Sequence, residues 1–375
     1  MTKLRFNGNS TPSIGIELEL GLVDAESFAL ANACDRLLTT LSAEVSSNPV
    51  AQYKPELMQC CVEINSGVSE TVADARADLE EKIGIVQSAC DNLGLQLWWG
   101  ATHPFSHWQD QQVTQNDRYL ALVELLQEMA RRLVTNGLHV HVGVESGDKA
   151  VMICDRIMQY LPTLLALSAS SPYWEGRDTG LQSHRSKIME GLPTAGLPTL
   201  MRNWSEYVWL VNHMEETGFI NTIREIWWDV RPHHNFGTVE VRVCDMPGSL
   251  DDACALAALI HCLVRHVSDE IDEGTYQFDC HPMMIRQNKW RAARFGLDAT
   301  LVNSYNYQVQ SVPVVAQQLT EQLQDVATEL QCRSELDHVM QIARRGNGAT
   351  QQRQILAVTG QPRAMVRQLI AASRI

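Results

Sequence analysis

Long apolar runs and the two commonest nucleotide-binding loops are missing from this sequence of 375 residues. No stretch of about 18 apolar residues occurs, so no membrane-spanning helix is expected. Neither a G-x-x-x-x-G-K-[ST] loop nor a G-x-G-x-x-G turn is present, which excludes the P-loop and Rossmann modes of binding a nucleotide. The start, Met1 to Ser10, lacks the apolar core of a signal peptide.

Basic residues are also in deficit, because 30 Lys and Arg stand against 44 Asp and Glu and leave a formal net charge of −14. Proteins that bind a phosphate backbone carry clustered Lys and Arg, so a nucleic-acid partner is not expected. An acidic surface also repels anionic membranes. The ten cysteines include no C-x-x-C pair. Without a signal peptide they are expected to be free thiols in a cytoplasmic protein.

The distribution of predicted elements favours an α+β fold. Hydrophobic residues make up 45% of the chain, which is ordinary for a globular protein. Strands crowd the first two thirds and helices dominate the end, as expected when helices cover one antiparallel sheet. No linker-like stretch interrupts the sequence, so a single domain over residues 1–375 is predicted, with C-terminal helices from about residue 299. The patterns predict strands over 13–23, 138–145 and 237–244, and helices over 70–93, 117–133, 149–169 and 250–271.

Three predicted strands place chemically active side chains two residues apart, and these pairs are Glu17 and Glu19, His139 and His141, and Glu240 and Arg242. Side chains alternate along a strand, so each pair shares one face. Crowded carboxylates raise one another's pKa, and Mg²⁺ or Mn²⁺ relieves this repulsion. A single pair is more often a solvated face, and H-x-H alone also suits a zinc hydrolase. The three pairs together favour a hard cation bound on a solvated face of the sheet. Neutralising Glu17 or Glu240 on such a face should leave the fold intact.

Glu56 and Glu63 form a harder case, because an odd spacing of seven places them on opposite faces of a straight strand. The segment over 53–65 is predicted to be extended. Both carboxylates reach one site only if the segment contains a bulge or a break, for which the neighbourhood of Cys60 and Cys61 is the candidate.

Several motifs together resemble the glutamate–cysteine ligase type 2 branch of the carboxylate–amine ligases. They follow the order found in that family and span roughly Ile14 to Asp298. The motifs are IGIELE (14–19), PEL (55–57), VEIN (62–65), GLHVHVG (137–143), SPYWEGRDTG (171–180) with SHR (183–185), IWWDVRP (226–232), GTVEVR (237–242) and NKWRAARFGLD (288–298). Many members have three consecutive glutamates in the first motif, whereas Leu18 replaces the central one here and is expected to face away from the site.

The resemblance implies a glutamine synthetase-like catalytic fold, in which a curved antiparallel sheet forms a funnel for metals and nucleotide phosphates. It implies that Arg242 contacts the transferring phosphoryl group. The Mg²⁺ or Mn²⁺ ligands implied by the resemblance are Glu17, Glu19, Glu56, Glu63, His139 and Glu240.

Other candidates are cationic or aromatic side chains within the same motifs. Arg185 is expected to clamp the carboxylate substrate or a phosphate, and Arg231 to hold phosphate oxygens, because a planar guanidinium binds both anions through two hydrogen bonds. His141, Lys289 and Arg291 are assigned to nucleotide or substrate binding, although a solvated basic helix face equally fits the last two. His103 is expected near the site.

The implied activity is ATP-dependent formation of an amide through an acyl-phosphate, with release of ADP and phosphate. The implied substrates are ATP, a carboxylate such as glutamate and an amine such as cysteine. One alternative is a phosphotransferase, because guanidino kinases resemble the same fold; a sensor of nucleotide or metal is another. The size of the chain is also compatible with a two-fold dimer.

Overall fold

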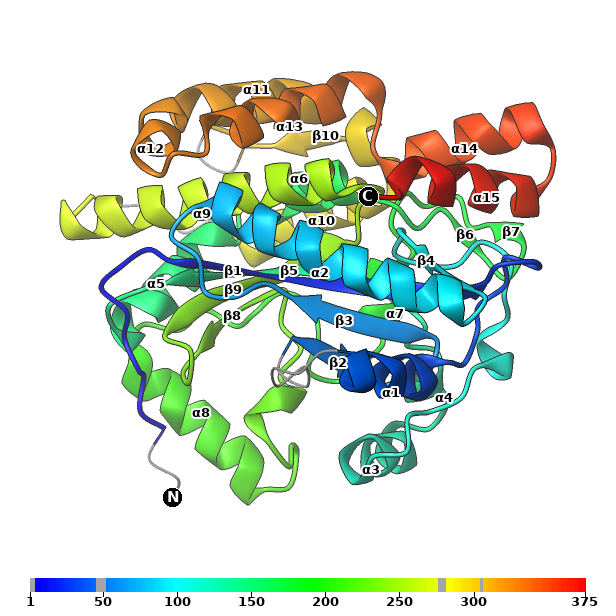
Figure 1. Cartoon of the computed structure of the whole chain (residues 1–375). Helices are drawn as coiled ribbons and strands as arrows, with labels where there is room; N and C mark the ends of the chain where they lie inside the picture. Colours follow the sequence, from blue (N-terminus) through cyan, green and yellow to red (C-terminus); the bar gives the residue numbers. More distant parts are fainter. Residues whose placement is uncertain (1–3, 45–51, 276–280, 304–305) are drawn as a thin grey trace.

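An open antiparallel sheet forms the centre of the computed structural model, which describes residues 4–44, 52–275, 281–303 and 306–375 (Figure 1). The seven-stranded sheet has the order β2-β3-β1-β5-β9-β8, and β4 also pairs with β1. Its strands are β1 (Ile14–Asp24), β2 (Tyr53–Pro55), β3 (Cys61–Asn65), β4 (Leu95–Trp98), β5 (Gly137–Gly143), β8 (Val230–His233) and β9 (Thr238–Asp245). Two further hairpins pair β6 (Tyr173–Trp174) with β7 (Arg177–Asp178) and β10 (Thr300–Val302) with β11 (Val309–Ser311).

Helices account for most of the remaining chain and lie on both sides of the sheet (Figure 1). They are α1 (Cys34–Glu44), α2 (Val72–Asn92), α3 (Asp117–Leu126), α4 (Glu128–Arg131), α5 (Gly147–Ile157), α6 (Leu161–Ser168), α7 (Arg185–Met189), α8 (Trp204–Glu216), α9 (Leu250–Asp272), α10 (Pro282–Phe295), α11 (Val312–Gln322), α12 (Gln324–Glu329), α13 (Arg333–Arg345), α14 (Gly348–Thr359) and α15 (Pro362–Ser373).

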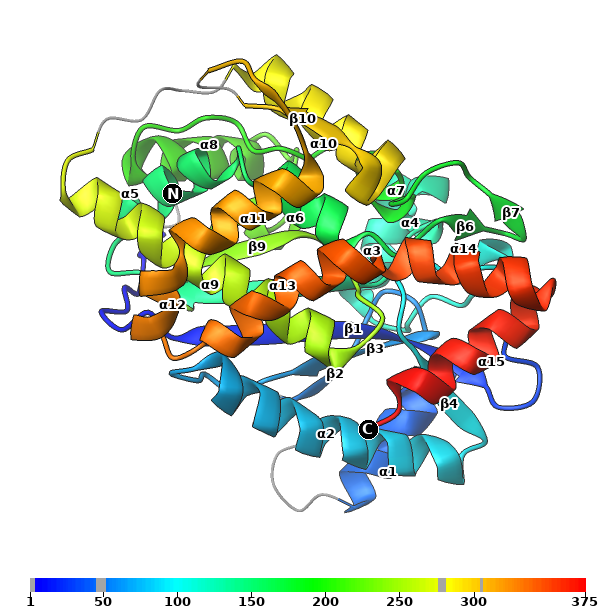
Figure 2. The ribbon, with the colours of Figure 1, turned by 90° about the horizontal axis from the view of Figure 1, so that it is seen from above.

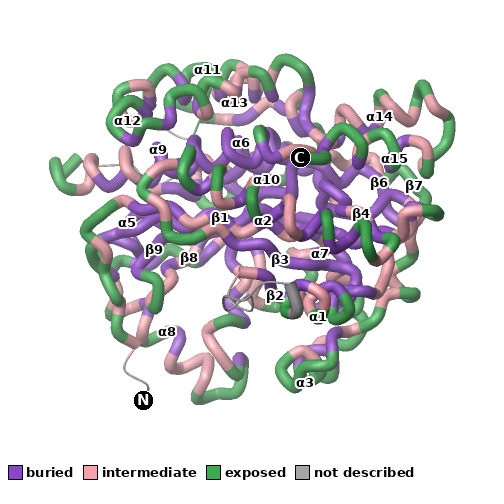
Figure 3. The backbone as a smooth tube through the Cα atoms, viewed as in Figure 1, coloured by how far each residue is buried: buried purple, intermediate pink, exposed green. Residues whose placement is uncertain are grey.

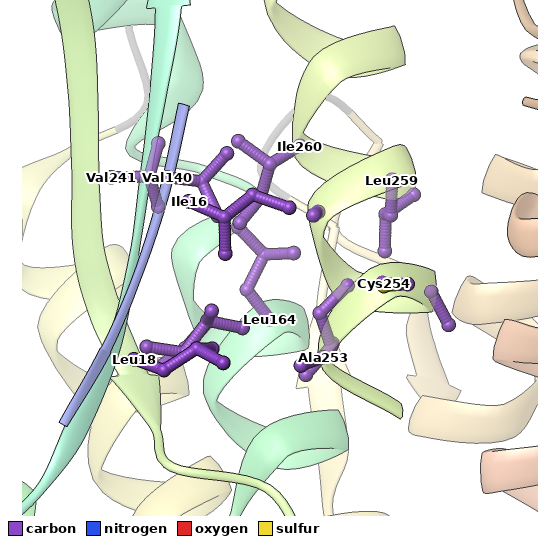
Figure 4. Close-up of a cluster of buried hydrophobic side chains, with 14 of the residues drawn as sticks. Ile16, Leu18, Val140, Leu164, Val241, Ala253, Cys254, Leu259 and Ile260 are labelled. Atoms are coloured by element: carbon purple, nitrogen blue, oxygen red, sulfur yellow. The ribbon is translucent and has the colours of Figure 1, made fainter. Parts of the chain in front are cut away.

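The apolar face of the sheet packs against α2, α6 and α9, and α11 and α13 cover these helices from outside (Figures 1 and 2). Along β1 the apolar side chains buried on this face are Ile14, Ile16, Leu18, Leu20 and Leu22, the alternation expected of a strand with one apolar face. Val23 is also buried, in a separate cluster. Figure 4 shows Ile16 and Leu18 beside Val140, Val241 and side chains of α9. Buried residues gather along the sheet and the helices that pack on it (Figure 3). The opposite face of the sheet carries the polar side chains.

Strand β9 contains a bulge opposite β5. Leu138 pairs with Cys244 and Val140 with Val241, so two residues of β9 oppose the single residue His139. Beyond the bulge the alternation of β9 is reversed, and Asp245 comes opposite Gly137. The bulge therefore turns one more carboxylate towards the polar face.

Several predicted elements are interrupted in the structure. The helix expected over 117–133 divides into α3 and α4 at Gln127, whose φ of 51° lies outside the helical region. The helix expected over 149–169 divides into α5 and α6, with Pro162 in the first turn of the second helix. The sequence patterns also did not predict the short strands β8, β10 and β11, because runs of three or four residues carry too little periodicity.

Among the residues that the structure describes, no single helix is long and apolar enough to cross a bilayer. The pair α5 and α6 meets that criterion only when joined, and the two helices are bent by 67° at the break.

Candidate active site

The first of two acidic clusters on the polar face joins β1, β5 and β9. Glu17 lies on β1, and His141 pairs with Glu240 across β5 and β9. The Nε2 atom of His141 is 3.4 Å from a Glu17 oxygen and 4.0 Å from a Glu240 oxygen. Its Nδ1 lies 3.0 Å from the Thr238 hydroxyl, which fixes the ring. One donor atom from each of the three residues lies within 4.8 Å of the others, a spacing that suits a cation.

The second cluster consists of Glu19, Glu56 and Glu63, whose nearest carboxylate oxygens also lie within 4.8 Å of one another. Glu19 pairs with Glu63 across β1 and β3. Glu56 follows directly after β2, and the chain reverses before β3 begins at Cys61. The break expected between Glu56 and Glu63 is thus a complete chain reversal, and it brings both carboxylates to the same face.

His139 lies between the two clusters. Its Nδ1 is 3.3 Å from Glu17 and its Nε2 is 3.6 Å from Glu19. The sequence-based assignment made His139 the cation ligand and His141 a substrate-binding residue. In the structure it is His141 that groups with Glu17 and Glu240. The two imidazoles share a strand face, and only the pairing of β5 with its two neighbours distinguishes their positions.

The carboxylates differ in pKa because their neighbours differ. Burial alone would raise the pKa of Glu17, but its hydrogen bonds with His139 and His141 hold that pKa well below its usual range. Burial alone would also raise the pKa of Glu240, but the charges of Arg231 and Arg242 lower it well below the usual range. Burial, together with Glu63 and Glu19, raises the pKa of Glu56 well above normal. Lys54 pairs with Glu63 at 3.0 Å, so the three carboxylates of the second cluster still outnumber its positive charge. A divalent cation would offset this excess of negative charge.

Glu240 is only 1% exposed and is bound by two arginines. Arg231, which pairs with it across β8 and β9, places Nε 2.7 Å from one oxygen. Arg242 donates to the other oxygen from the same strand. The expectation of a wet face is therefore wrong at Glu240, although Glu17 and Glu19 retain some exposure.

A cleft with about 810 Å³ of unfilled space opens beside the second cluster. Its polar wall includes Glu19, Glu56, His139, Arg185 and Arg242. Apolar side chains also line the cleft: Leu30, Leu57, Met58, Leu122, Leu133, Val134, Met189, Leu192 and Trp227. Such a combination of apolar walls and a few convergent charges is typical of a small-molecule site.

Arg185 is buried in the cleft wall with few partners for its guanidinium. Its Nη2 donates to the Arg242 carbonyl at 3.4 Å, and the nearest carboxylate oxygen, on Asp245, is 4.0 Å from Nη1. Its Nε has no hydrogen-bond partner among the described residues. A buried guanidinium left so poorly bonded costs free energy, so the site suits an anionic ligand.

The structure gives three other candidates different environments. Lys289 is buried on α10 between Asp229, 2.5 Å away, and Glu190, 2.9 Å away, so its charge is already paired. Arg291 is half-buried on the same helix. His103 lies in the cleft wall, but burial lowers its pKa to about 3 and its Nε2 lies 2.9 Å from the Phe28 carbonyl. Within the described part of the chain, none of the three forms a hydrogen bond or ion pair with either acidic cluster.

Sequence reasoning overlooked two charged residues of this region. Arg118 lines the cleft from α3, and its guanidinium lies 5.0 Å from the centre of the Tyr119 ring. Asp245 is completely buried beside Arg185. A hint for Asp245 was present, since an acid directly after Val243 and Cys244 interrupts an apolar pattern, but only the bulge shows which face it takes.

Solved structures of two ligases share this arrangement of an open antiparallel sheet covered by helices. The structure of glutamate–cysteine ligase from Francisella tularensis in complex with AMP has this fold, with a TM-score of 0.71 over 99% of this chain and 90% of that one. A bifunctional glutathione synthetase from Pasteurella multocida also gives 0.71, over 97% of this chain and 52% of that chain. Sequence identities of 13% and 14% make these likenesses of fold alone.

The chain belongs to glutamate–cysteine ligase family 2 (GCS2), whose sequence model matches residues 13–372. A protein of Gloeobacter violaceus with the provisional name glutamate–cysteine ligase 2 is 41% identical over 350 residues, which are 93% of this chain and 94% of that protein. A Mycobacterium tuberculosis protein with the same provisional name is 38% identical over 372 residues, 98% of this chain and 97% of its own length. These findings confirm the resemblance and give no support to the phosphotransferase alternative.

Proposed function

We propose that this ATP-dependent carboxylate–amine ligase joins the side-chain carboxylate of glutamate to the amine of cysteine or of a similar small molecule. The observation that carries the proposal is the cleft beside two acidic clusters, with the poorly bonded Arg185 in its wall. In the proposed reaction a glutamate carboxylate oxygen attacks the γ-phosphorus of ATP and ADP departs. The amine then attacks the acyl carbon, the carbon–oxygen bond to phosphate breaks, and the amine loses a proton.

The donor sets fit Mg²⁺ or Mn²⁺. Glu19, Glu56 and Glu63 offer three carboxylates, and Glu17, His141 and Glu240 offer two carboxylates and an imidazole. His139 contacts Glu17 and Glu19, so it orients one residue of each set and is retained as a further candidate ligand. When bound, such cations neutralise phosphate charge and act as Lewis acids. Burial, and after it the charges of Glu63 and Glu19, raise the pKa of Glu56, and a bound cation would offset both effects, which supports this assignment.

Arg185 is proposed to bind a carboxylate of the substrate. The residue lines the cleft and lacks strong partners, so a bidentate carboxylate would complete its hydrogen bonding. Arg118 and Arg242 line the same cleft and match Glu19 and Glu56 in number, so Arg185 gives the lining its excess of positive charge, which favours an anion.

Arg242 is proposed to stabilise the transferring phosphoryl group, with Glu240 and Arg231 holding it in place. Arg242 lines the cleft and is bonded to Glu240, which Arg231 binds from the neighbouring strand. A guanidinium fixed in this way needs little rearrangement as charge moves onto the phosphoryl oxygens. Neither Lys289 nor Arg291 is included in this proposal.

The test is a phosphate-release assay with ATP, Mg²⁺ and pairs of amino acids. The proposal predicts phosphate release that depends on glutamate and is accelerated by cysteine or another amine, with one amide formed per phosphate. Accumulation of a phosphorylated acceptor without phosphate release, or no response to any carboxylate, would contradict it.

A further inference from the structure

The position of Arg185 is fixed by something other than its own side-chain bonds. The guanidinium makes one hydrogen bond of 3.4 Å to a backbone carbonyl, which is too weak to hold a long flexible side chain. Yet the residue is only 5% exposed and lines the cleft. Its placement must therefore come from its backbone, at the start of α7, and from the surface against which the side chain lies.

Asp245 connects that backbone to the sheet. One carboxylate oxygen accepts the Ser171 hydroxyl at 2.6 Å and the Ser170 amide at 2.9 Å. The other oxygen accepts the Ser183 hydroxyl at 2.8 Å. The loop that carries β6 and β7 is thereby closed at both ends on a single buried carboxylate.

The connection continues to Arg185 itself. The backbone N–H of Arg185 donates to the Ser171 hydroxyl oxygen at 3.0 Å, so two consecutive hydrogen bonds join the Asp245 carboxylate to the Arg185 main chain. On the other side, the Ser186 amide donates to the Ser183 hydroxyl at 3.3 Å. Asp245 thus anchors the first turn of α7 through both serines.

Strand β5 provides the matching surface for the side chain. A Cβ atom added to Gly137 would lie 2.2 Å from Nη2 of Arg185, so only glycine allows the guanidinium to lie there. Gly137 is also the residue opposite Asp245, in the register that the bulge in β9 creates. The bulge therefore places Asp245 next to Gly137, whose missing side chain leaves room for the Arg185 guanidinium.

We propose that Asp245 is a positioning residue that holds Arg185, through Ser171 and Ser183, against Gly137 and towards the cleft. This inference rests on the proposed function, in which Arg185 binds the substrate carboxylate. Asp245 itself touches no substrate. Because it acts only through Arg185, its loss should weaken binding of the carboxylate substrate and leave ATP binding almost unchanged.

The test compares Ser171→Ala, Asp245→Asn and Arg185→Ala in the phosphate-release assay with L-glutamate. Arg185→Ala should raise the KM for glutamate at least about thirtyfold, as truncation of a buried charge pair does. Ser171→Ala should raise it about three- to tenfold, the effect of one or two ordinary hydrogen bonds, and the KM for ATP should stay within about twofold. Ser373→Ala removes a buried serine hydrogen bond on α15 and is the matched control, with no expected change.

A double variant separates positioning from general stabilisation. If Ser171 acts through Arg185, adding Ser171→Ala to Arg185→Ala should not raise the KM for glutamate further, because coupled residues are not additive. A further rise, or an unchanged KM in Ser171→Ala, overturns the inference even where Arg185→Ala has its full effect. An unchanged KM in Arg185→Ala refutes the proposed role of Arg185 instead. If melting shows that Asp245→Asn does not fold, Ser171→Ala and the double variant still decide the matter.

Discussion

Glu240→Gln should destabilise the protein as well as inactivate it. Glu240 is the common partner of Arg231 and Arg242, whose side chains are 11% and 15% exposed. The substitution removes the negative charge and leaves two cations facing one another in a largely water-free environment. Breaking a buried ion pair by removing one partner typically costs about 3–5 kcal/mol.

This cost translates into a measurable change of melting temperature. At about 2.1 cal/mol/K per residue, the unfolding entropy of a 375-residue chain is about 0.8 kcal/mol/K. A loss of about 3–5 kcal/mol therefore lowers Tm by about 4–6 °C. The assay is a thermal melt without nucleotide or metal, so that lost ligand binding does not contribute.

Glu128→Gln is the control for this measurement. Its side chain is 69% exposed and lies 4.0 Å from Arg132, an arrangement that contributes about 0.5 kcal/mol or less. Replacing Arg231 by Gln in the Glu240→Gln background should recover part of the stability, because the repulsion between the two arginines is then removed. A Tm for Glu240→Gln within about 1 °C of the unchanged protein would refute the reasoning.

Three further predictions concern the cation, the phosphoryl group and pH. Mg²⁺ or Mn²⁺ with ATP should raise Tm by about 3 °C at one hundred times the dissociation constant, and a shift with zinc alone would instead favour a hydrolase. Arg242→Ala should lower kcat about a hundred- to a thousandfold with a smaller change in ATP affinity, and Arg242→Lys should recover part; equal loss in both measures would contradict a role confined to the transition state. Burial lowers the pKa of His103 to about 3. When the protein unfolds at a pH below the ordinary value near 6.5, the His103 imidazole therefore takes up a proton. Stability should therefore fall as pH drops, by about 1.6 kcal/mol from pH 6.5 to 5 for this group alone, and His103→Gln should flatten the slope seen in urea melts.

The alternation of side chains was sufficient to predict the polar strand faces. Glu17, Glu19, His139, His141 and Glu240 all lie on strands with apolar residues behind them, because a period of two follows from strand geometry alone. The resemblance to the family added Glu56 and Glu63, which periodicity placed on opposite faces.

What could not be predicted depends on contacts between distant residues. The positions of His139 and His141 relative to the two acidic clusters are distinguished only by the register of β5 with β1 and β9. The burial of Glu240 depends on β8, a four-residue strand containing Pro232 that the sequence pattern did not predict. The sequence pattern is compatible with Lys289 as a surface cation on a basic helix, whereas in the structure it is paired with Asp229 and Glu190. The bulge that turns Asp245 towards Arg185 likewise needs two paired strands before it exists.

The central claim, amide formation through an acyl-phosphate, is tested most directly by isotope transfer. Glutamate carrying ¹⁸O in both oxygens of its side-chain carboxylate is incubated with the enzyme, ATP, Mg²⁺ and the amine that gives phosphate release. One carboxylate oxygen forms the bond to phosphorus and leaves with it, so one ¹⁸O atom is expected in inorganic phosphate for each amide formed. Phosphate without ¹⁸O, at the same yield of amide, would contradict it.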